Sequence, residues 1–191
     1  MSHEFKIRRH DEVYRGVIVN LTVDQITTGA GIDTVREVFH HPGGSAVLPV
    51  LPSGDVVLVR QFRYPIQRDL LELPAGKIDP GETPESTARR ELAEEVGYRA
   101  GVLEKLGEFY TTPGFCTEKL HLFMATELSP ADEKGDDDEE IVVEHFSLTE
   151  LESLLHSGKL ADAKTIIGIQ CLLLRLPQIR NHQERQPISQ D

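Results

Sequence analysis

The chain has 191 residues, of which 39% are hydrophobic and 27% are charged. This length suits one domain with a small extension, and the composition is that of a globular protein, not of a disordered or fibrous one. Lys and Arg number 20 against 32 Asp and Glu, which gives a formal net charge of −12. A field of that sign opposes a phosphate backbone, so we expect no nucleic-acid partner. A phosphate-containing substrate would need a cation or local arginines at its site.

The cysteine content and the apolar segments indicate the compartment. Cys116 and Cys171 are the only cysteines in the sequence, too few for a disulfide framework. The first ten residues lack the continuous apolar core of a secretory signal. The longest apolar stretch, 166–176, is interrupted by polar residues and is shorter than the ~20 residues needed to span a bilayer. We therefore expect a cytoplasmic protein with no lipid anchor and no membrane partner.

Four segments rich in β-branched residues precede residue 75, at 13–27, 33–39, 46–51 and 56–62. Glycine- and proline-rich separators between them predict that the first third is antiparallel β structure. The separator at 52–55, between two apolar runs, predicts a hairpin. Residues 13–20 and 33–39 are predicted to form a strand pair that lies before the core. Such an isolated pair is marginal in water unless it packs on something.

The second half alternates strands with helices. Thr83 as N-cap, Pro84 at the first helical position and Gly97 after the last turn predict a helix over 83–96. Strand-like runs follow at 103–111, 120–126 and 141–146, and the sequence Ser147-Leu148-Thr149-Glu150 predicts a capping box that opens a short helix. Another helix is expected over about 162–176. This order predicts an α+β fold with helices on a mixed sheet.

Three carboxylates lie along one edge of the helix predicted at 83–96. At about 100° per residue, Glu91, Glu94 and Glu95 fall within an arc of about 100°. Like charges one turn apart, as Glu91 and Glu95 are, destabilise a helix by a few tenths of a kcal/mol. A divalent cation would turn this repulsion into attraction, and Mg²⁺ takes one or two carboxylates together with water and substrate phosphate. The alternative is a solvated acidic face.

The residues around these carboxylates form a specific pattern. From Gly76 it runs through five residues to Glu82, and through seven more to Arg90-Glu91-Leu92-Ala93-Glu94-Glu95-Val96-Gly97-Tyr98. This pattern resembles the Nudix box, the signature of hydrolases that cleave nucleoside diphosphates linked to another moiety; Tyr98 stands where a bulky aliphatic residue is usual. The lead-in at 57–64, the sequence Glu72-Leu73-Pro74-Ala75-Gly76, and Pro113, fifteen residues after Tyr98, are similar to the ADP-ribose pyrophosphatase branch.

The resemblance implies a fold and a set of roles. The fold is a Nudix-type α/β/α sandwich with a mixed sheet at 45–178, after an N-terminal antiparallel β segment at 1–44 and before a polar tail at 179–191. The implied cofactor is Mg²⁺, with Mn²⁺ as an alternative. The implied metal ligands are Glu91, Glu95, the Ala75 carbonyl and Glu139. Glu94 is the third member of the acidic group, Arg90 orients a glutamate by ion pairing, and Glu82 fixes the loop.

A second acidic segment, 132–140, carries seven carboxylates directly before the strand predicted at 141–146. Most acidic loops are simply solvated. In the resembled branch, a loop between the last strands contributes a glutamate that binds metal or activates water. Glu139 is the first candidate for that catalytic role and Glu140 the second, because both adjoin the strand that would anchor the loop.

Further residues are expected on the substrate side. Arg60 and Arg63 would point to opposite faces of a regular strand, so only one of them would reach a diphosphate with its bidentate fork. The alternative role for either arginine is pairing with Glu72 or another carboxylate. The remaining substrate-side candidates are Glu72, Pro113, Gly114 and Glu118; the alternative for Glu118 is an ordinary surface position.

The resemblance implies Mg²⁺-dependent hydrolysis of the diphosphate bond of a small nucleotide sugar, ADP-ribose, to AMP and ribose 5-phosphate. The alternatives are another substrate, such as GDP-mannose or UDP-glucose, and a catalytically silent ligand-sensing domain. The intact Arg90, Glu91, Glu94 and Glu95 argue against the silent domain. The branch also implies a homodimer, in which the N-terminal strands are exchanged and complete the base-binding pocket; the rival is a monomer whose strands fold back on their own core.

Overall fold

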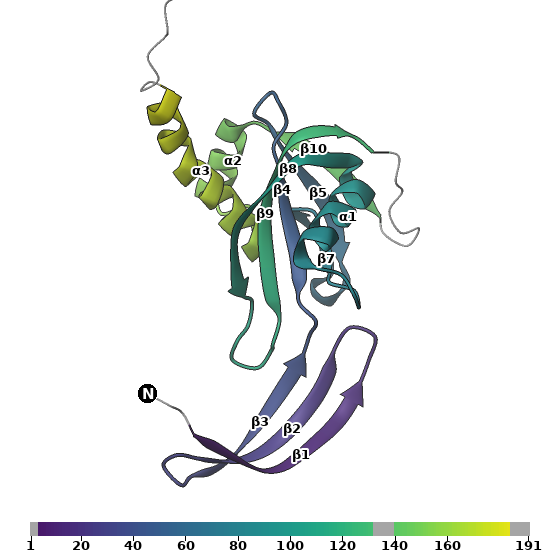
Figure 1. The fold of residues 1–191 in the computed structure, drawn as a ribbon, viewed down its shortest axis with the longest axis vertical. Coiled ribbons are helices and arrows are strands. Elements are labelled where there is room, and N and C mark those ends of the chain that lie inside the picture. The colour runs from purple at the N-terminus through teal and green to yellow at the C-terminus, as the bar shows by residue number, and fades with distance from the viewer. Residues whose placement is uncertain (1–3, 132–139, 184–191) are drawn as a thin grey trace, which may run out of the picture.

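The computed structural model describes residues 4–131 and 140–183 (Figure 1). The elements in chain order are β1 (Phe5–Arg15), β2 (Asn20–Thr28), β3 (Asp33–His40), β4 (Gly44–Pro49), β5 (Val56–Arg63), the 3₁₀ helix η1 (Tyr64–Ile66), β6 (Arg68–Glu72), β7 (Ala75–Lys77), α1 (Pro84–Val96), β8 (Tyr98–Tyr110), β9 (Lys119–Pro130), β10 (Ile141–Phe146), α2 (Leu148–His156) and α3 (Ala163–Gln183). In this described part, no helix is both long and apolar enough to cross a membrane.

The N-terminal strands form a separate antiparallel sheet in the order β1-β2-β3, at the bottom of Figure 1. The expectation of one strand segment over 13–27 is wrong, because the chain turns between β1 and β2, where the Gly16 N–H donates to the Val19 carbonyl at 3.0 Å. A Cβ at Gly16 would contact the Tyr14 ring, so a larger residue here would displace that side chain. The predicted pairing of 13–20 with 33–39 is also wrong: β2 pairs with β3 from Asn20 to Thr27 and lies in the middle.

The rest of the chain forms two sheets covered by helices on opposite sides (Figure 1). The first sheet has the order β7-β4-β9-β8, in which β4 and β9 are parallel, and the second has the order β10-β5-β6. Helix α1 lies on one side of these sheets, and α2 and α3 lie on the other. The predicted α+β fold, with helices on a mixed sheet, is therefore confirmed.

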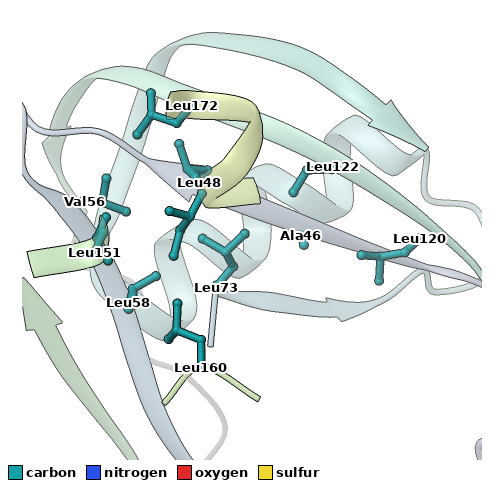
Figure 2. Packing of buried hydrophobic residues seen from close by; sticks show 11 residues of the cluster. Ala46, Leu48, Val56, Leu58, Leu73, Leu120, Leu122, Leu151, Leu160 and Leu172 are labelled. Atoms are coloured by element: carbon teal, nitrogen blue, oxygen red, sulfur yellow. The ribbon is translucent and has the colours of Figure 1, made fainter. Parts of the chain in front are cut away.

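Strand periodicity divides the buried residues into two cores. In β4, Ala46 and Leu48 face α2 and α3, whereas Val47 faces α1. Strand β5 alternates in the same way, with Leu58 toward α2 and α3 and Val57 toward α1. Figure 2 shows the core under α2 and α3, where Leu151 and Leu172 supply the helix side. Strands buried on both faces read as continuous apolar runs, as residues 46–48 of β4 and 56–59 of β5 do.

The turn predicted at 52–55 exists, but it does not join a hairpin. The Leu51 N–H donates to the Asp55 carbonyl at 2.8 Å, and one bridge pairs Val50 with Val56. Beyond that bridge the two strands enter different sheets, because β7 and β9 occupy the edges of β4, and β6 and β10 occupy those of β5. No strand was predicted between residues 62 and 83, but the short strands β6 and β7 lie there.

The helix boundaries follow the predicted caps. The Thr83 hydroxyl accepts from the Ser86 N–H, Pro84 opens α1, and Gly97 closes it with φ of 70°, a left-handed conformation that glycine adopts without strain. Ser147 and Glu150 form the predicted capping box of α2. These caps fix where α1 begins and ends, and therefore which of its side chains face β7.

Candidate functional site

A cavity of about 940 Å³ lies where β7, α1, the segment after β8 and the start of α3 meet. This volume is at the upper end of the range for small-molecule sites. Many of its lining residues are charged. The lining residues are Val17, Ile18, His41, Gly44, Arg63, Ala75, Gly76, Lys77, Asp79, Arg90, Glu91, Glu94, Glu95, Phe109, Tyr110, Thr111, Thr112, Glu118, Leu120, Asp162, Ala163, Lys164 and Ile167.

The predicted box residues meet at this cavity because α1 packs directly against β7. Glu95 accepts a hydrogen bond from the Ala75 N–H at 3.1 Å between Oε2 and N. A Cβ at Gly76 would overlap the carboxylate of Glu91 where it lies, so a larger residue would have to displace the end of that side chain. The glycine in the pattern thus leaves room for the Glu91 carboxylate beside β7.

Arg90 holds the acidic residues of this region together. Its Nε and Nη2 donate to the two oxygens of Glu82, at 2.8 and 3.0 Å. Its Nη1 donates to Glu91 at 2.7 Å and to Glu94 at 2.9 Å, and Nη2 also reaches the Lys77 carbonyl at 3.3 Å. One guanidinium therefore pairs with three carboxylates and ties the loop after β7 to the helix.

The hydrogen bonds from Arg90, together with one from the Thr87 hydroxyl, lower the pKa of Glu82 from 4.5 to about 2. Because the folded pKa lies below the unfolded one, the ionised Glu82 contributes stability that is fully present above pH 4.5 and is lost as the pH falls toward 2. We expect Glu82→Gln to flatten this part of the pH dependence of the unfolding free energy. Urea unfolding of both proteins at several values between roughly pH 5 and 2.5 measures it; parallel curves would contradict the assignment.

The donor set fits a hard divalent cation in its chemistry. Glu91, Glu94, Glu95 and the Ala75 carbonyl offer only oxygen ligands, which Mg²⁺ prefers. Within the described residues, no three acidic, histidine or cysteine side chains are gathered tightly enough to hold a metal as they stand. Arg90 and the Ala75 N–H occupy oxygens of these glutamates. Metal binding would therefore exchange some of these hydrogen bonds for coordination.

The two candidate arginines have different surroundings. Arg60 donates to both oxygens of Glu144, at 2.5 and 3.3 Å, and does not line the cavity. Arg63 lines the cavity and donates to both oxygens of Glu72, each at 2.7 Å. The structure therefore brings Arg63, and not Arg60, to the cavity, and it pairs each of them with a carboxylate.

Glu72 is buried, with 2% of its side chain exposed, and does not line the cavity. It also contacts the ammonium of Lys164. Burial alone would raise the pKa of Glu72, but the Arg63 hydrogen bonds and the Lys164 charge outweigh it and lower this pKa below its ordinary value. Glu72 thus anchors two cationic side chains at the cavity wall.

Of the predicted site residues after β8, only some line the cavity. Glu118 lines the cavity, accepts from the Thr111 hydroxyl at 2.6 Å and lies 3.6 Å from the His41 ring nitrogen Nδ1. Pro113 and Gly114 are exposed and do not line the cavity. Glu140 is exposed and does not line it either, and Glu139 lies outside the described residues.

Sequence reasoning missed several residues of the cavity. Lys164 and Asp162 come from the start of α3, and Val17 and Ile18 come from the turn between β1 and β2. Asp162 carries a signal in the sequence, because Asp before a predicted helix is a typical N-cap. In the structure its side chain accepts from the Thr165 N–H at 2.9 Å. No local pattern marks Lys164, which lies 92 positions from its partner Glu72.

Comparisons with known proteins match the chain to a family and to several named relatives. The NUDIX domain family model matches residues 40–167. The chain is 42% identical to a Bacillus subtilis protein named ADP-ribose pyrophosphatase, over 91% of this chain and 95% of that one. It is 37% identical to a Bacillus methanolicus protein named methanol dehydrogenase activator, over 90% and 94%. It is 36% identical to a Yersinia enterocolitica protein named GDP-mannose pyrophosphatase, over 74% and 79%.

A solved structure has the same fold. It is described as an ADP compounds hydrolase, superposes with a TM-score of 0.82, and matches 92% of this chain and 96% of its own length. Its sequence is 24% identical, so this likeness concerns the fold.

Proposed function

This chain belongs to the Nudix family, and from that premise we propose that it is a Mg²⁺-dependent enzyme that hydrolyses the diphosphate bond of ADP-ribose to AMP and ribose 5-phosphate. The observation that carries the proposal is the convergence of Glu91, Glu94, Glu95 and Arg90 on one side of a cavity of about 940 Å³. Such a volume suits a nucleoside diphosphate sugar. The similarity to the Bacillus subtilis protein supports the choice of ADP-ribose.

The proposed cation site consists of Glu91, Glu95 and the Ala75 carbonyl. When bound there, Mg²⁺, or Mn²⁺ in its place, neutralises charge on the diphosphate and polarises its oxygens. Arg90 keeps Glu91 and Glu94 in place through hydrogen bonds of 2.7 and 2.9 Å. The fork of Arg63 is held by Glu72 at the cavity wall, where a diphosphate oxygen can accept from it.

The reaction needs a base for the attacking water, and we assign this role to Glu139, with Glu140 as the alternative. The carboxylate takes a proton as the water oxygen forms a bond to phosphorus. The bond from that phosphorus to the bridging oxygen breaks, and the electron pair leaves with the second phosphate. Each half of the substrate then carries one phosphate monoester.

A turnover screen of nucleoside diphosphate sugars with Mg²⁺ tests the substrate. We expect AMP from ADP-ribose to appear with a higher kcat/KM than GMP from GDP-mannose or UMP from UDP-glucose. Preference for GDP-mannose would support the second candidate, which the similarity to the Yersinia protein favours. Binding of ADP-ribose without turnover would indicate a ligand-sensing domain, against which the presence of all three glutamates and Arg90 argues.

We also propose a cytoplasmic homodimer in which the N-terminal sheet packs on the partner subunit. The two cysteines are free thiols, as expected in a reducing compartment. The N-terminal sheet carries large hydrophobic side chains that are more than half exposed: Phe5, Ile7, Val13, Tyr14 and Val35. A second subunit would bury them, and a two-fold symmetric interface is the commonest kind.

Light scattering over a dilution series tests the dimer. We expect a mass near twice the single-chain value of 21.4 kDa. Ile7→Glu, which places a charge on the exposed apolar surface of the sheet, should shift the mass toward the monomer. A single-chain mass at micromolar concentration, with full activity, would contradict any contribution of the partner to the site.

A further inference from the structure

The first turn of α3 is joined by hydrogen bonds to the chain segment that precedes β7. Thr165 is completely buried. Its hydroxyl accepts from the Leu73 N–H at 2.7 Å and donates to an Asp162 carboxylate oxygen at 2.6 Å. The same oxygen accepts from the Thr165 N–H at 2.9 Å, so Asp162 caps the helix and orients the threonine hydroxyl.

A second connection runs beside the first. The Lys164 ammonium lies 3.1 Å from the other oxygen of Asp162 and also contacts the buried Glu72. Glu72 and Leu73 are consecutive. The start of α3 therefore binds Glu72 through its side chain and Leu73 through its backbone N–H. This turn of α3 therefore restrains the chain at the end of β6, where it crosses from one sheet to the other.

The restrained segment leads directly to the proposed cation ligand. Pro74 has no N–H, so the N–H of Leu73 is the last backbone donor before Ala75. The Pro74 carbonyl accepts from the Val47 N–H at 2.9 Å, and the Ala75 N–H donates to Glu95 at 3.1 Å. Three elements thus hold three consecutive residues: α3 holds Leu73, β4 holds Pro74, and α1 holds Ala75.

We propose that Thr165, oriented by Asp162, is a positioning residue for the cation site, because it fixes the backbone that presents the Ala75 carbonyl to the glutamates of α1. This inference rests on the proposed function. A valine methyl would fill the same buried volume as the hydroxyl, so packing alone does not require threonine. The hydroxyl is needed because the Leu73 N–H is buried and must be paired. Residues behind metal ligands commonly set metal affinity in this way.

The test compares Thr165→Val, which removes the hydroxyl, with Thr165→Ser, which keeps it. Binding of Mn²⁺ alone is measured from the signal of free Mn²⁺ in electron paramagnetic resonance, without substrate. We expect T165V to weaken Mn²⁺ binding by about 10–100-fold and to raise the Mg²⁺ concentration for half-maximal activity by a similar factor. T165S should stay within about twofold of the wild type, because it retains the acceptor for the Leu73 N–H.

Ser147→Ala is the matched control for a purely structural effect. Ser147 caps α2 as Asp162 caps α3, but it does not line the cavity. We expect S147A to lower the urea midpoint without changing Mn²⁺ affinity. Wild-type Mn²⁺ affinity in T165V, with a lowered urea midpoint like that of S147A, would overturn the proposal.

If T165V does not fold, Thr165→Cys decides, because the thiol is close in size to the hydroxyl but is a weaker acceptor for the Leu73 N–H, and the charge of the cavity wall does not change. Weaker Mn²⁺ binding in T165C supports the positioning role, and unchanged binding refutes it. A wild-type protein that binds no Mn²⁺ and hydrolyses no nucleotide sugar would instead refute the proposed function itself.

Discussion

Replacing Glu95 by Gln, or Glu91 by Gln, is expected to lower ADP-ribose hydrolysis by about 10³-fold while the fold is retained. The amide oxygen of Gln can still accept the hydrogen bond that Glu95 receives from the Ala75 N–H, so the contact between α1 and β7 survives. What disappears is a negative charge at the proposed cation site. A loss of about 4 kcal/mol in transition-state stabilisation corresponds to this factor, at about 1.4 kcal/mol per tenfold.

The measurement is kcat/KM at saturating and at limiting Mg²⁺, with far-ultraviolet circular dichroism to confirm the fold. Glu85→Gln is the matched control, because Glu85 is exposed in the first turn of the same helix and does not line the cavity. It should change activity less than about twofold, since it removes only a favourable charge at the helix N-terminus. Near-normal turnover of Glu95→Gln at limiting Mg²⁺ would show that this glutamate is not a metal ligand.

The second large effect is expected at the acidic segment before β10. If Glu139 takes the proton from water, Glu139→Gln should lower kcat by about 10²–10⁴-fold, with a smaller effect on KM. The described residue that begins β10, Ile141, pairs with Gln61, two positions before Arg63, which lines the cavity.

Glu140→Gln and Asp136→Asn complete this experiment. Glu140→Gln distinguishes the two candidates, since only the residue that handles water should give a large decrease in kcat. Asp136→Asn removes one charge from the same acidic segment and controls for its general electrostatic effect. Unchanged kcat for both glutamate variants would leave the segment as an ordinary solvated loop.

The proposed cation site was largely predictable because its residues are close in sequence. Helical periodicity alone places Glu91, Glu94 and Glu95 along one edge of α1, and the caps at Thr83 and Gly97 fix its ends. Alternation along β5 placed Arg60 and Arg63 on opposite faces. Which of the two arginines lines the cavity depends on how the sheet that contains β5 packs in the whole fold, and no local pattern encodes that.

The strand pairings were predicted less well, for a related reason. The sequence marks apolar, β-branched runs, but it does not show which edges of each strand are already occupied. Strand β4 is paired on both edges by β7 and β9, so β5 could not continue the hairpin suggested by the turn at 52–55. In the N-terminal sheet, the bend at Gly16 divides one apolar run into two strands and moves β2 to the centre.

By itself, the sequence determined the fold class, the limits of α1, the start of α2, and the cluster of glutamates that follows a glycine-containing loop. These features depend on neighbours within about one or two helical turns, or on alternation along one strand. Only the tertiary structure decided that Arg63 and Lys164 meet at Glu72, and that Thr165 pairs with Leu73. Those contacts join residues 9 to 92 positions apart, and they arise because buried charges and backbone donors must find partners wherever packing brings them together.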